Sequence, residues 1–469
     1  MSDLATPRER PLRVAVVGSG PAGFYAAGQL IDAGEEVEVD MIERLPTPWG
    51  LVRFGVAPDH PKIKAVSRVY EKIAARPGFR FLGNVEVGRD LAHEDLVRLY
   101  DAVVYALGTQ TDRRLGIPGE DLPGSWSATA FVNWYNAHPD FQELDFDFDV
   151  ERAVVIGNGN VAVDVARMLA LTHEELAPTD TTDEAIAAIA GSSLREIVMV
   201  GRRGPVQGAF TTVELKELGE LAGADVLVDP ADLELDPASE AQLASDTKAQ
   251  RNLEVLRGYA GREPQGKPRL LRLRFFLSPV AILGDGKVEA IELVRNRLEE
   301  DESGRLVAVA TGERETVPCG LVFRSVGYRG IPVPGVPFDE RRATMRNDCG
   351  RVLDEDGQPV PGVYCTGWIK RGPTGIIGTN KKDAAETTAL VLEDLAAGRL
   401  PRREEATAEA VDALLAERGA EPVTYEGWTA IDEEERSRGE PLGRPRVKLC
   451  TWEELLAAAA APQRAGRGS

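Results

Sequence analysis

The chain has 469 residues, of which 43% are hydrophobic and 28% charged, so it is long enough for two or more domains with full cores. Its 55 basic and 76 acidic residues give a formal net charge of −21, which argues against nucleic acid and anionic membrane as partners. The cysteines form no C-x-x-C pair, so a metal centre, an iron–sulfur cluster and a redox-active dithiol are not expected among Cys319, Cys349, Cys365 and Cys450.

The first ten residues are polar, and no stretch approaches the roughly 18 apolar residues that span a bilayer. We therefore expect no export signal and no membrane segment. The cysteines are then free thiols in a reducing compartment, and the expected location is the cytoplasm.

Short Val/Ile runs alternate with helical stretches, a pattern typical of an α/β fold with doubly wound parallel sheets. The first unit runs from Leu12 to about Glu43. Its strand, residues 14–17, leads into the turn Gly18-Ser19-Gly20-Pro21-Ala22-Gly23 and then a helix. Glycines at this place allow a tight turn and let backbone N–H groups approach a pyrophosphate at the helix N-terminus.

Glu43 follows the next strand, residues 37–42, twenty residues beyond Gly23. A carboxylate at this position accepts hydrogen bonds from ribose hydroxyls, which an unphosphorylated adenosine offers. The first turn therefore predicts an FAD site. Further along, the sequence predicts a helix over residues 63–75, a strand from residues 79–83, a buried strand over residues 100–109 and an interdomain crossing at residues 116–121.

A second strand, residues 153–156, precedes the turn Gly157-Asn158-Gly159-Asn160-Val161-Ala162. After the following strand, residues 197–200, come Arg202 and Arg203. Two guanidinium groups at a strand end suit a 2′-phosphate, so this turn predicts an NADPH site. Arg202 lies 45 residues beyond Gly157, about twice the usual spacing, and an insertion at residues 171–193 accounts for the excess.

The acidic stretch at residues 229–246 is expected to be an exposed loop and helix. Residues 320–328 are interpreted as a strand that returns to the first domain. The predicted architecture is therefore two Rossmann-like dinucleotide-binding domains, with the NADP-binding domain (residues 110–328) inserted into a discontinuous FAD-binding domain (residues 1–109 and 329–469).

Two further stretches, residues 48–64 and residues 367–380, are rich in glycine and proline yet apolar. The first is too irregular for a helix or strand and is expected to cover the isoalloxazine ring. The second precedes a helix, and its glycines would present backbone N–H groups to the flavin or its phosphates.

Longer strings carry a more specific signal. They are residues 45–53, residues 57–62 (Ala-Pro-Asp-His-Pro-Lys), residues 157–162, residues 200–205 (Val-Gly-Arg-Arg-Gly-Pro) and residues 370–375 (Lys-Arg-Gly-Pro-Thr-Gly). From Val14 to about Trp452, the chain resembles adrenodoxin reductase and the bacterial NADPH:ferredoxin reductases of the glutathione-reductase structural superfamily. The resemblance implies an FAD enzyme that passes electrons from NADPH to a ferredoxin.

The resemblance also implies site residues. Those implied for FAD, with the turn glycines Gly18, Gly20 and Gly23, are Ala22, Glu43, Leu51, Val87, Trp368, Gly375, Ile376 and Ile377. Those implied for NADP are Arg113, Asn158, Gly159, Asn160, Val161, Arg202, Arg203, Glu214 and Gly375. His60 and Glu214 resemble the active-site pair beside the nicotinamide, where we expect them to position the ring and order a water.

Because the chain holds no dithiol or cluster, the electron acceptor must be external, and the resemblance implies an acidic ferredoxin. Docking on a protein of charge −21 then needs a local basic face. The candidates are Lys216, Arg251, Arg257, Arg262, Lys267, Arg269, Arg272 and Arg274. The alternatives are a disulfide reductase, which the cysteine pattern disfavours, an NADPH-dependent oxidase or diaphorase with another acceptor, a flavin monooxygenase, and a non-enzymatic NADPH sensor.

Overall fold

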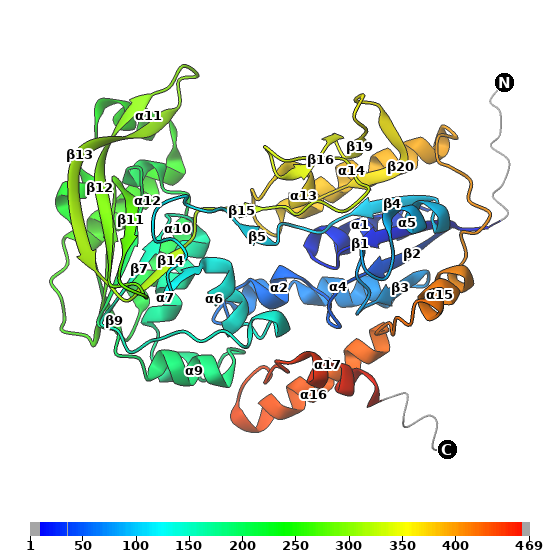
Figure 1. Ribbon diagram of the computed structural model, residues 1–469, viewed down its shortest axis with the longest axis horizontal. Coiled ribbons are helices and arrows are strands. Elements are labelled where there is room, and N and C mark those ends of the chain that lie inside the picture. The colour runs from blue at the N-terminus through cyan, green and yellow to red at the C-terminus, as the bar shows by residue number, and fades with distance from the viewer. Residues whose placement is uncertain (1–9, 35, 462–469) are drawn as a thin grey trace.

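The computed structural model describes residues 10–34 and 36–461 and contains two large sheets in two lobes (Figure 1). The seven-stranded sheet has the order β18-β19-β20-β4-β1-β2-β3, and the six-stranded sheet the order β6-β14-β7-β8-β10-β9. All pairs of the six-stranded sheet are parallel, as are those from β20 to β3 in the other.

The strands of the seven-stranded sheet are β1 (Leu12–Val17), β2 (Val37–Ile42), β3 (Phe79–Leu82), β4 (Ala102–Tyr105), β18 (Asn347–Asp348), β19 (Arg351–Leu353) and β20 (Pro359–Cys365). Those of the six-stranded sheet are β6 (Ser125–Ser127), β7 (Arg152–Ile156), β8 (Glu196–Val200), β9 (Ala224–Val228), β10 (Arg269–Arg274) and β14 (Leu321–Arg324). The smaller sheets comprise β11 (Leu277–Leu283), β12 (Ala290–Glu300) and β13 (Leu306–Pro318), then β5 (Thr111–Asp112) with β15 (Tyr328–Arg329), and β16 (Phe338–Asp339) with β17 (Thr344–Met345).

The helices of the first lobe are α1 (Pro21–Ile31), α2 (Leu51–Phe54), α3 (Pro61–Lys64), α4 (Ser67–Ala74), α5 (His93–Leu99), α13 (Trp368–Arg371), α14 (Thr379–Ala396), α15 (Ala408–Glu417), α16 (Tyr425–Gly439) and α17 (Trp452–Ala459). Those of the second are α6 (Ala128–Tyr135), α7 (Asn160–Ala170), α8 (His173–Leu176), α9 (Asp183–Ala190), α10 (Thr212–Glu217), α11 (Pro237–Ser245) and α12 (Thr247–Ala260).

Both faces of each large sheet are covered, which explains the continuous apolar runs of the central strands. All six residues of β1 are buried; Val14 and Val16 face one core while Ala15 and Val17 face another. In the second lobe, Ala153 and Val155 pack in the helical core, whereas the opposite face packs against β11–β13. The predicted fold class is confirmed: the strands of the six-stranded sheet lie, in sequence, between β4 and β18 of the other.

Three local expectations need correction. The helix predicted over residues 63–75 is divided into α3 and α4 by a turn at Ala65 and Val66. Residues 48–64 contain two one-turn helices, α2 and α3, rather than irregular backbone alone. Residues 320–328 do not return to the first sheet: β14 pairs with β6 and β7, because its apolar residues 321–323 are buried in the second lobe's cores. The crossing between lobes is the β5–β15 pair.

The C-terminal helices α16 and α17 lie beneath the first lobe and reach toward α9 of the second (Figure 1). Arg444, between them, is buried and donates hydrogen bonds to the carbonyl oxygens of Thr179 and Thr181 just before α9. The C-terminal segment therefore contacts both lobes. Within residues 10–34 and 36–461, no helix is long and apolar enough to cross a membrane.

Candidate active site between two nucleotide-binding edges

The first glycine turn lies at the carboxyl edge of the seven-stranded sheet, between β1 and α1. A Cβ on Gly18, whose φ is +104°, would lie 2.6 Å from the Ala106 carbonyl oxygen, and one on Gly23 would lie 2.0 Å from that of Gly18. A Cβ on Gly20 would meet nothing within 4 Å. Gly18 and Gly23 are therefore required by the backbone, whereas Gly20 leaves room beside the uncapped N-terminus of α1, as a bound pyrophosphate requires.

Glu43 supports this turn directly. Its Oε2 accepts hydrogen bonds from the backbone nitrogen of Ser19 at 3.0 Å and the Ser19 hydroxyl at 2.7 Å, and Oε1 accepts one from the Leu45 nitrogen at 3.1 Å. The sequence predicted a ribose contact, and that role stays a prediction. The structure adds a second role, since the carboxylate holds the glycine turn in place.

The two apolar glycine-rich stretches meet this edge. Gly50 lies against Gly20, and a Cβ on Gly367 would lie 2.7 Å from the Cβ of Ala22. Leu51 and Ile376 are 37% and 64% exposed, which is unusual for large apolar side chains. An open phosphate turn bordered by apolar loops fits a dinucleotide with a flat aromatic ring, and thus FAD.

The other residues implied for FAD differ in position. Trp368 begins α13, and its indole nitrogen donates to the Thr374 carbonyl oxygen at 3.1 Å. Gly375 has a φ of +82°, and Ile377 packs against the first lobe's core. Val87 is half-buried, whereas Val85 is 1% exposed and its nitrogen donates to the Glu43 carbonyl oxygen. The contact of Val87 with FAD stays a prediction.

The second glycine turn lies at the carboxyl edge of the six-stranded sheet. A Cβ on Gly157 would lie 2.3 Å from the Ser325 carbonyl oxygen, while the space at Gly159 is open except for Ala209 at 3.9 Å. The Asn158 side chain lies against Gly201, at the end of β8, with its buried amide nitrogen unpaired. Helix α7 has no side-chain cap, so its first N–H groups are available to a phosphate.

Arg202 and Arg203 follow Gly201 and therefore lie next to this turn. Arg202 is exposed and Arg203 half-buried, and neither guanidinium group has a carboxylate partner in the part of the chain that the structure describes. Burial, together with the neighbouring charge of Arg202, lowers the pKa of Arg203. Two adjacent unpaired cations beside a phosphate-sized space fit NADP(H), whose 2′-phosphate would balance them.

Arg113, also implied for NADP, lies on the crossing between the lobes. It is exposed, and its backbone nitrogen donates to the Gly327 carbonyl oxygen at 2.8 Å. Asn160 has a further role: its side-chain oxygen accepts a hydrogen bond from the Thr211 nitrogen at 2.8 Å. Since Thr211 caps α10, the glycine turn is tied to the helix that carries Glu214.

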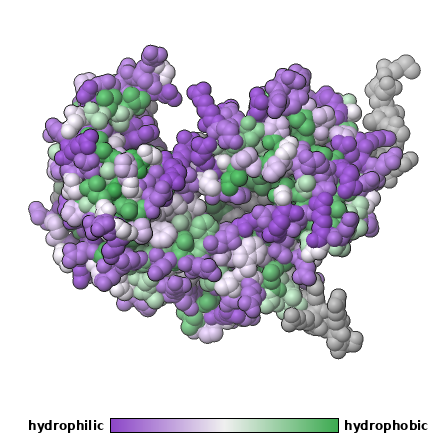
Figure 2. Space-filling model, viewed as in Figure 1, coloured by the Kyte–Doolittle hydropathy of each residue, from purple (hydrophilic) through white to green (hydrophobic). Residues whose placement is uncertain are grey.

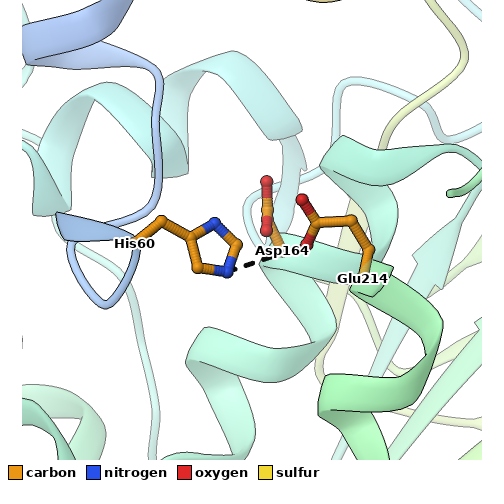
Figure 3. Close-up of side chains that lie close together, drawn as sticks. All are labelled: His60, Asp164 and Glu214. Carbon is orange, nitrogen blue, oxygen red and sulfur yellow. Dashed lines mark ion pairs between the residues drawn. The ribbon is translucent and has the colours of Figure 1, made fainter. Parts of the chain in front are cut away.

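His60 and Glu214 come from different lobes and face each other (Figure 3). Their Nε2 and Oε2 atoms are 3.8 Å apart, and both side chains are about nine-tenths buried. Asp164, on α7, lies beside them. A ring nitrogen of His60 and one carboxylate oxygen each of Asp164 and Glu214 all lie within 4.8 Å of one another. The structure thus brings together the two residues that the family resemblance implied as a pair, and their place beside a nicotinamide stays a prediction.

Four charged residues of this cluster were not identified from the sequence: Asp59, Asp164, Arg167 and Glu217. His60 lies closer to Glu217 than to Glu214: its Nε2 atom is 2.9 Å from Glu217 Oε2. Asp164 and Arg167 are three residues apart on α7, as are Glu214 and Glu217 on α10, and such spacing places side chains on one helix face. The spacing was a usable signal, but only the meeting of the lobes brings both helices to His60.

Burial and surrounding carboxylates perturb the acids in this cluster. Burial, and then the charges of Glu214, Asp59 and Glu217, raise the pKa of Asp164 to about 8 despite the opposing charge of Arg167. Burial also raises the pKa of Glu214, against the charges of His60 and Arg167. Two carboxyl groups that gain protons more readily than usual, beside a histidine, are typical of a functional site.

The cluster and the Trp368 loop border the same region. Trp368 stacks on Tyr328, with ring centroids 5.6 Å apart. Burial raises the pKa of the Tyr328 hydroxyl, and the charges of Asp112 and Asp164 raise it further. The space-filling view is hollowed between the two lobes (Figure 2), so a ring held at each sheet edge has room to approach the other.

The predicted basic docking residues divide into two groups. Lys216, Arg251, Arg257 and Arg262 are exposed. Arg269 is instead buried and donates to the carbonyl oxygens of Leu169, Leu171 and Ile189, so its selection was wrong. Arg272 pairs with Glu196, Arg274 with Asp232 and Glu315, and Lys267 donates to the Leu221 carbonyl oxygen. These three are engaged in structural contacts.

Comparisons with known proteins agree with this arrangement. A profile of the pyridine nucleotide-disulphide oxidoreductase family matches residues 12–200. The NADPH-ferredoxin reductase FprA of Mycobacterium tuberculosis (strain H37Rv) is 52% identical over 457 residues, which cover 95% of this chain and 99% of that protein. The mitochondrial NADPH:adrenodoxin oxidoreductase of Arabidopsis thaliana is 42% identical over 464 residues, 96% of each chain.

Among solved structures, Mycobacterium tuberculosis FprA in complex with NADPH superposes with a TM-score of 0.91 at 50% identity, covering 96% of this chain and 100% of that one. Similarity of this extent includes both sheets, both glycine turns and the loops between them. The chain belongs to the family of NADPH-ferredoxin reductases and NADPH:adrenodoxin oxidoreductases.

Proposed function

We propose that this protein is an NADPH–ferredoxin reductase that uses bound FAD to pass electrons from NADPH to a ferredoxin-type iron–sulfur protein. The observation that carries this proposal is one chain with two open glycine turns of different chemistry, one beside Glu43 and one beside Arg202 and Arg203. The two lobes that carry these turns also meet at the charged cluster of His60, Asp164 and Glu214. The full-length similarity to FprA supports the same activity.

FAD would bind at the edge of the first sheet. Gly20 and the N-terminus of α1 would receive its pyrophosphate, and Glu43 its ribose. The other residues proposed for this site are Gly18, Ala22, Gly23, Leu51, Val87, Trp368, Gly375, Ile376 and Ile377. The exposure of Leu51 and Ile376 supports this assignment, since a bound flavin would cover them.

NADP(H) would bind at the edge of the second sheet. Asn158, Gly159, Asn160 and Val161 would contact the pyrophosphate, and Arg202 and Arg203 the 2′-phosphate. Glu214 would lie beside the nicotinamide, and Arg113 and Gly375 would also lie near the NADP. The unpaired guanidinium groups and the open space at Gly159 support this placement.

Bound FAD would supply the redox chemistry, since it takes two electrons at once and releases them singly. The residues of this chain would hold the rings in contact and exclude water. Glu214, with its raised pKa, would hydrogen-bond the carboxamide of the nicotinamide and fix which face it presents. His60 Nε2, held by Glu217 at 2.9 Å, would order a water or hold a proton at the same place.

These roles are tested with His60→Gln and Glu214→Gln in the FAD-loaded protein. Each variant should slow reduction of the flavin by NADPH about 10-fold to 100-fold, because misplacement of the ring by about 1 Å has such effects. Lys287→Gln, an exposed residue paired with Asp147, is the control. Unchanged reduction rates in both site variants would remove His60 and Glu214 from the active site.

The acceptor would dock on the exposed basic residues of α10 and α12. Lys216 and Arg251 line a shallow cavity of about 210 Å³ together with Thr212, Glu254 and Val255. Reversal of both charges should raise the KM for an acidic ferredoxin and weaken its salt dependence. Arg297→Glu, paired with Glu299 on β12, is the control, and equal effects of both changes would exclude this surface.

The domain division follows from the same proposal. Residues 1–109 and 329–469 would form the FAD-binding domain, and residues 110–328 the NADP-binding domain. Strands of the seven-stranded sheet come from the first set and those of the six-stranded sheet from the second, which supports the boundaries. The cytoplasm remains the proposed location, supported by the free thiols of Cys319 and Cys365.

An oxidase or diaphorase that delivers electrons to oxygen, a quinone or a dye is the second candidate function. The hollow between the lobes favours it in one respect, since a small acceptor would reach the same rings as NADPH (Figure 2). Ferredoxin and oxygen would then compete for the reduced protein. Mixing the NADPH-reduced protein with an oxidised ferredoxin in the absence of oxygen separates the two functions.

A further inference from the structure

Arg167 lies at the centre of the charged cluster, and its side chain is 3% exposed. Both terminal nitrogens of the guanidinium group donate hydrogen bonds, and Nη2 also donates to Asp59 Oδ1 at 3.1 Å, whereas Nε lies near Asp59 without forming a hydrogen bond. Nε lies 2.9 Å from Asp59 Oδ2, Nη2 donates to Asp164 Oδ1 at 2.8 Å, and Nη1 lies 3.3 Å from Glu214 Oε2 and 2.9 Å from Glu217 Oε2. One buried cation therefore contacts four carboxylates.

These four carboxylates come from three parts of the chain. Asp59 precedes His60 in the first lobe, Asp164 shares α7 with Arg167, and Glu214 and Glu217 are on α10 of the second lobe. Arg167 consequently joins the segment that carries His60 to the helix that carries Glu214. The connection crosses from one lobe to the other at the site of reaction.

His60 and Arg167 share their acceptors. The atom Glu217 Oε2 lies 2.9 Å from both His60 Nε2 and Arg167 Nη1, and Glu214 Oε2 lies 3.8 Å and 3.3 Å from the same two nitrogens. The separation of His60 and Glu214 thus depends on where Arg167 holds the two glutamates. Without it, the negative charge on these partly buried acidic side chains would be unbalanced, and their repulsion would push α10 and the His60 segment apart.

We propose that Arg167 is a positioning residue for electron transfer from NADPH, which sets His60 and Glu214 relative to each other across the two lobes. The proposal rests on the proposed function of that pair. Lysine would not replace it, because one ammonium group cannot reach acceptors on three segments, whereas the planar guanidinium presents five N–H donors in a fixed fork.

The test compares Arg167→Lys, Arg167→Gln and a matched control, Arg444→Gln, in the FAD-loaded protein. Arg444 is also buried and also joins the two lobes, but its partners are Thr179, Thr181 and Asp183. Both Arg167 variants should slow flavin reduction at saturating NADPH about 10-fold to 100-fold, while the Kd for NADP+ changes less than about threefold. Arg444→Gln should lower the melting temperature and leave both values unchanged.

A double-mutant cycle with Glu214→Gln identifies how Arg167 acts. If it acts through Glu214, the double variant should be little slower than Glu214→Gln alone. Histidine-selective NMR of the oxidised protein gives a readout that needs no turnover. The His60 signals, assigned with His60→Gln, should move in Arg167→Lys and not in Arg444→Gln.

Unchanged flavin reduction in Arg167→Lys, additive effects in the cycle, or an equal loss in Arg444→Gln would each overturn the proposal. If Arg167→Gln does not fold, the lysine variant, which keeps the charge, decides alone. Wild-type protein that NADPH does not reduce would overturn the proposed function instead, and the NMR comparison would still test the position of His60.

Discussion

At the residue scale, Arg202 and Arg203 are proposed to bind the 2′-phosphate and so to favour NADPH over NADH. Charge-assisted hydrogen bonds contribute about 1.5–3 kcal/mol each, so replacing Arg202 and Arg203 with alanine should lower kcat/KM for NADPH by at least about 100-fold. The value for NADH, which lacks the 2′-phosphate, should change little. Steady-state kinetics with both dinucleotides measure the ratio, and Arg297→Ala serves as the surface control. A ratio that stays constant would show that the phosphate binds elsewhere.

Asp164 should make stability depend on pH. Its pKa of about 8 in the folded protein, caused first by burial, exceeds the value of about 4 expected in the unfolded chain. The folded state therefore binds this proton more tightly, and the stability it contributes is present below pH 4 and lost as the pH rises toward 8. Asp164→Asn should thus gain stability relative to wild type between pH 5 and pH 8.5.

Thermal unfolding of both proteins across that range measures the difference in melting temperature. The prediction concerns its change with pH rather than its value at one pH, because the substitution also removes an ion pair with Arg167. If the melting temperatures of the two proteins changed in parallel with pH, Asp164 would be ionised over the whole pH range.

The sequence was sufficient to single out His60 and the two arginines as candidates, because each lies within a specific string of residues, and Glu214 through the family resemblance; their roles stay predictions. It was insufficient for Arg167 and Asp59. The two residues contact each other across 108 positions of the chain, and only the packing of one lobe on the other reveals this contact. The prediction that Arg269 belongs to an exposed docking face was wrong. The sequence pattern of a strand does not distinguish a basic side chain that faces solvent from one that donates to buried backbone carbonyl groups.

At the scale of elements, different glycines of the turn between β1 and α1 are expected to be needed for folding and for ligand binding. Gly20→Ala should fold normally, since its φ is −75° and nothing lies within 4 Å of the added methyl group. The methyl group would occupy the space assigned to the pyrophosphate and cost about 1–3 kcal/mol, so FAD affinity should fall about 10-fold to 100-fold.

Gly23→Ala is the comparison, because its Cβ would lie 2.0 Å from a carbonyl oxygen and should destabilise the FAD-free protein itself. FAD titration by fluorescence and melting of the FAD-free protein provide the two measurements. Unaltered FAD affinity in Gly20→Ala would place the pyrophosphate away from this turn.

Helices and strands were predicted correctly where apolar runs are continuous. The predictions failed where tertiary contacts determine which strands pair or whether a short helix forms. The buried strands β1, β4, β7 and β8 follow from their Val/Ile content. β14 has the same character, and its place in the second sheet depends on pairing with β7, which no local pattern specifies. The short helices α2 and α3 form within a glycine- and proline-rich stretch because the first lobe packs around them.

At the scale of the molecule, the C-terminal segment stabilises the fold through buried ion pairs. Glu435 is fully buried, pairs with Arg53 and Arg446, and accepts a hydrogen bond from the Leu449 nitrogen. Removing one member of a buried ion pair costs about 3–5 kcal/mol, so Glu435→Gln should unfold at a clearly lower temperature.

Its neighbour provides the control. Glu434 pairs with Arg438 on the exposed face of the same helix, and Glu434→Gln should change stability by less than about 0.5 kcal/mol. Calorimetry of both variants measures the difference. Equal melting temperatures would mean that the C-terminal segment does not limit the stability of the whole protein.

The direction of electron flow through both lobes is the central claim, and anaerobic double-mixing stopped-flow spectroscopy tests it most directly. FAD-loaded protein is mixed first with NADPH and then with an oxidised [2Fe–2S] or [4Fe–4S] ferredoxin. We predict rapid bleaching of the flavin in the first step and its rapid return, with reduction of the ferredoxin, in the second. Bleaching that only oxygen or a quinone reverses would contradict the account.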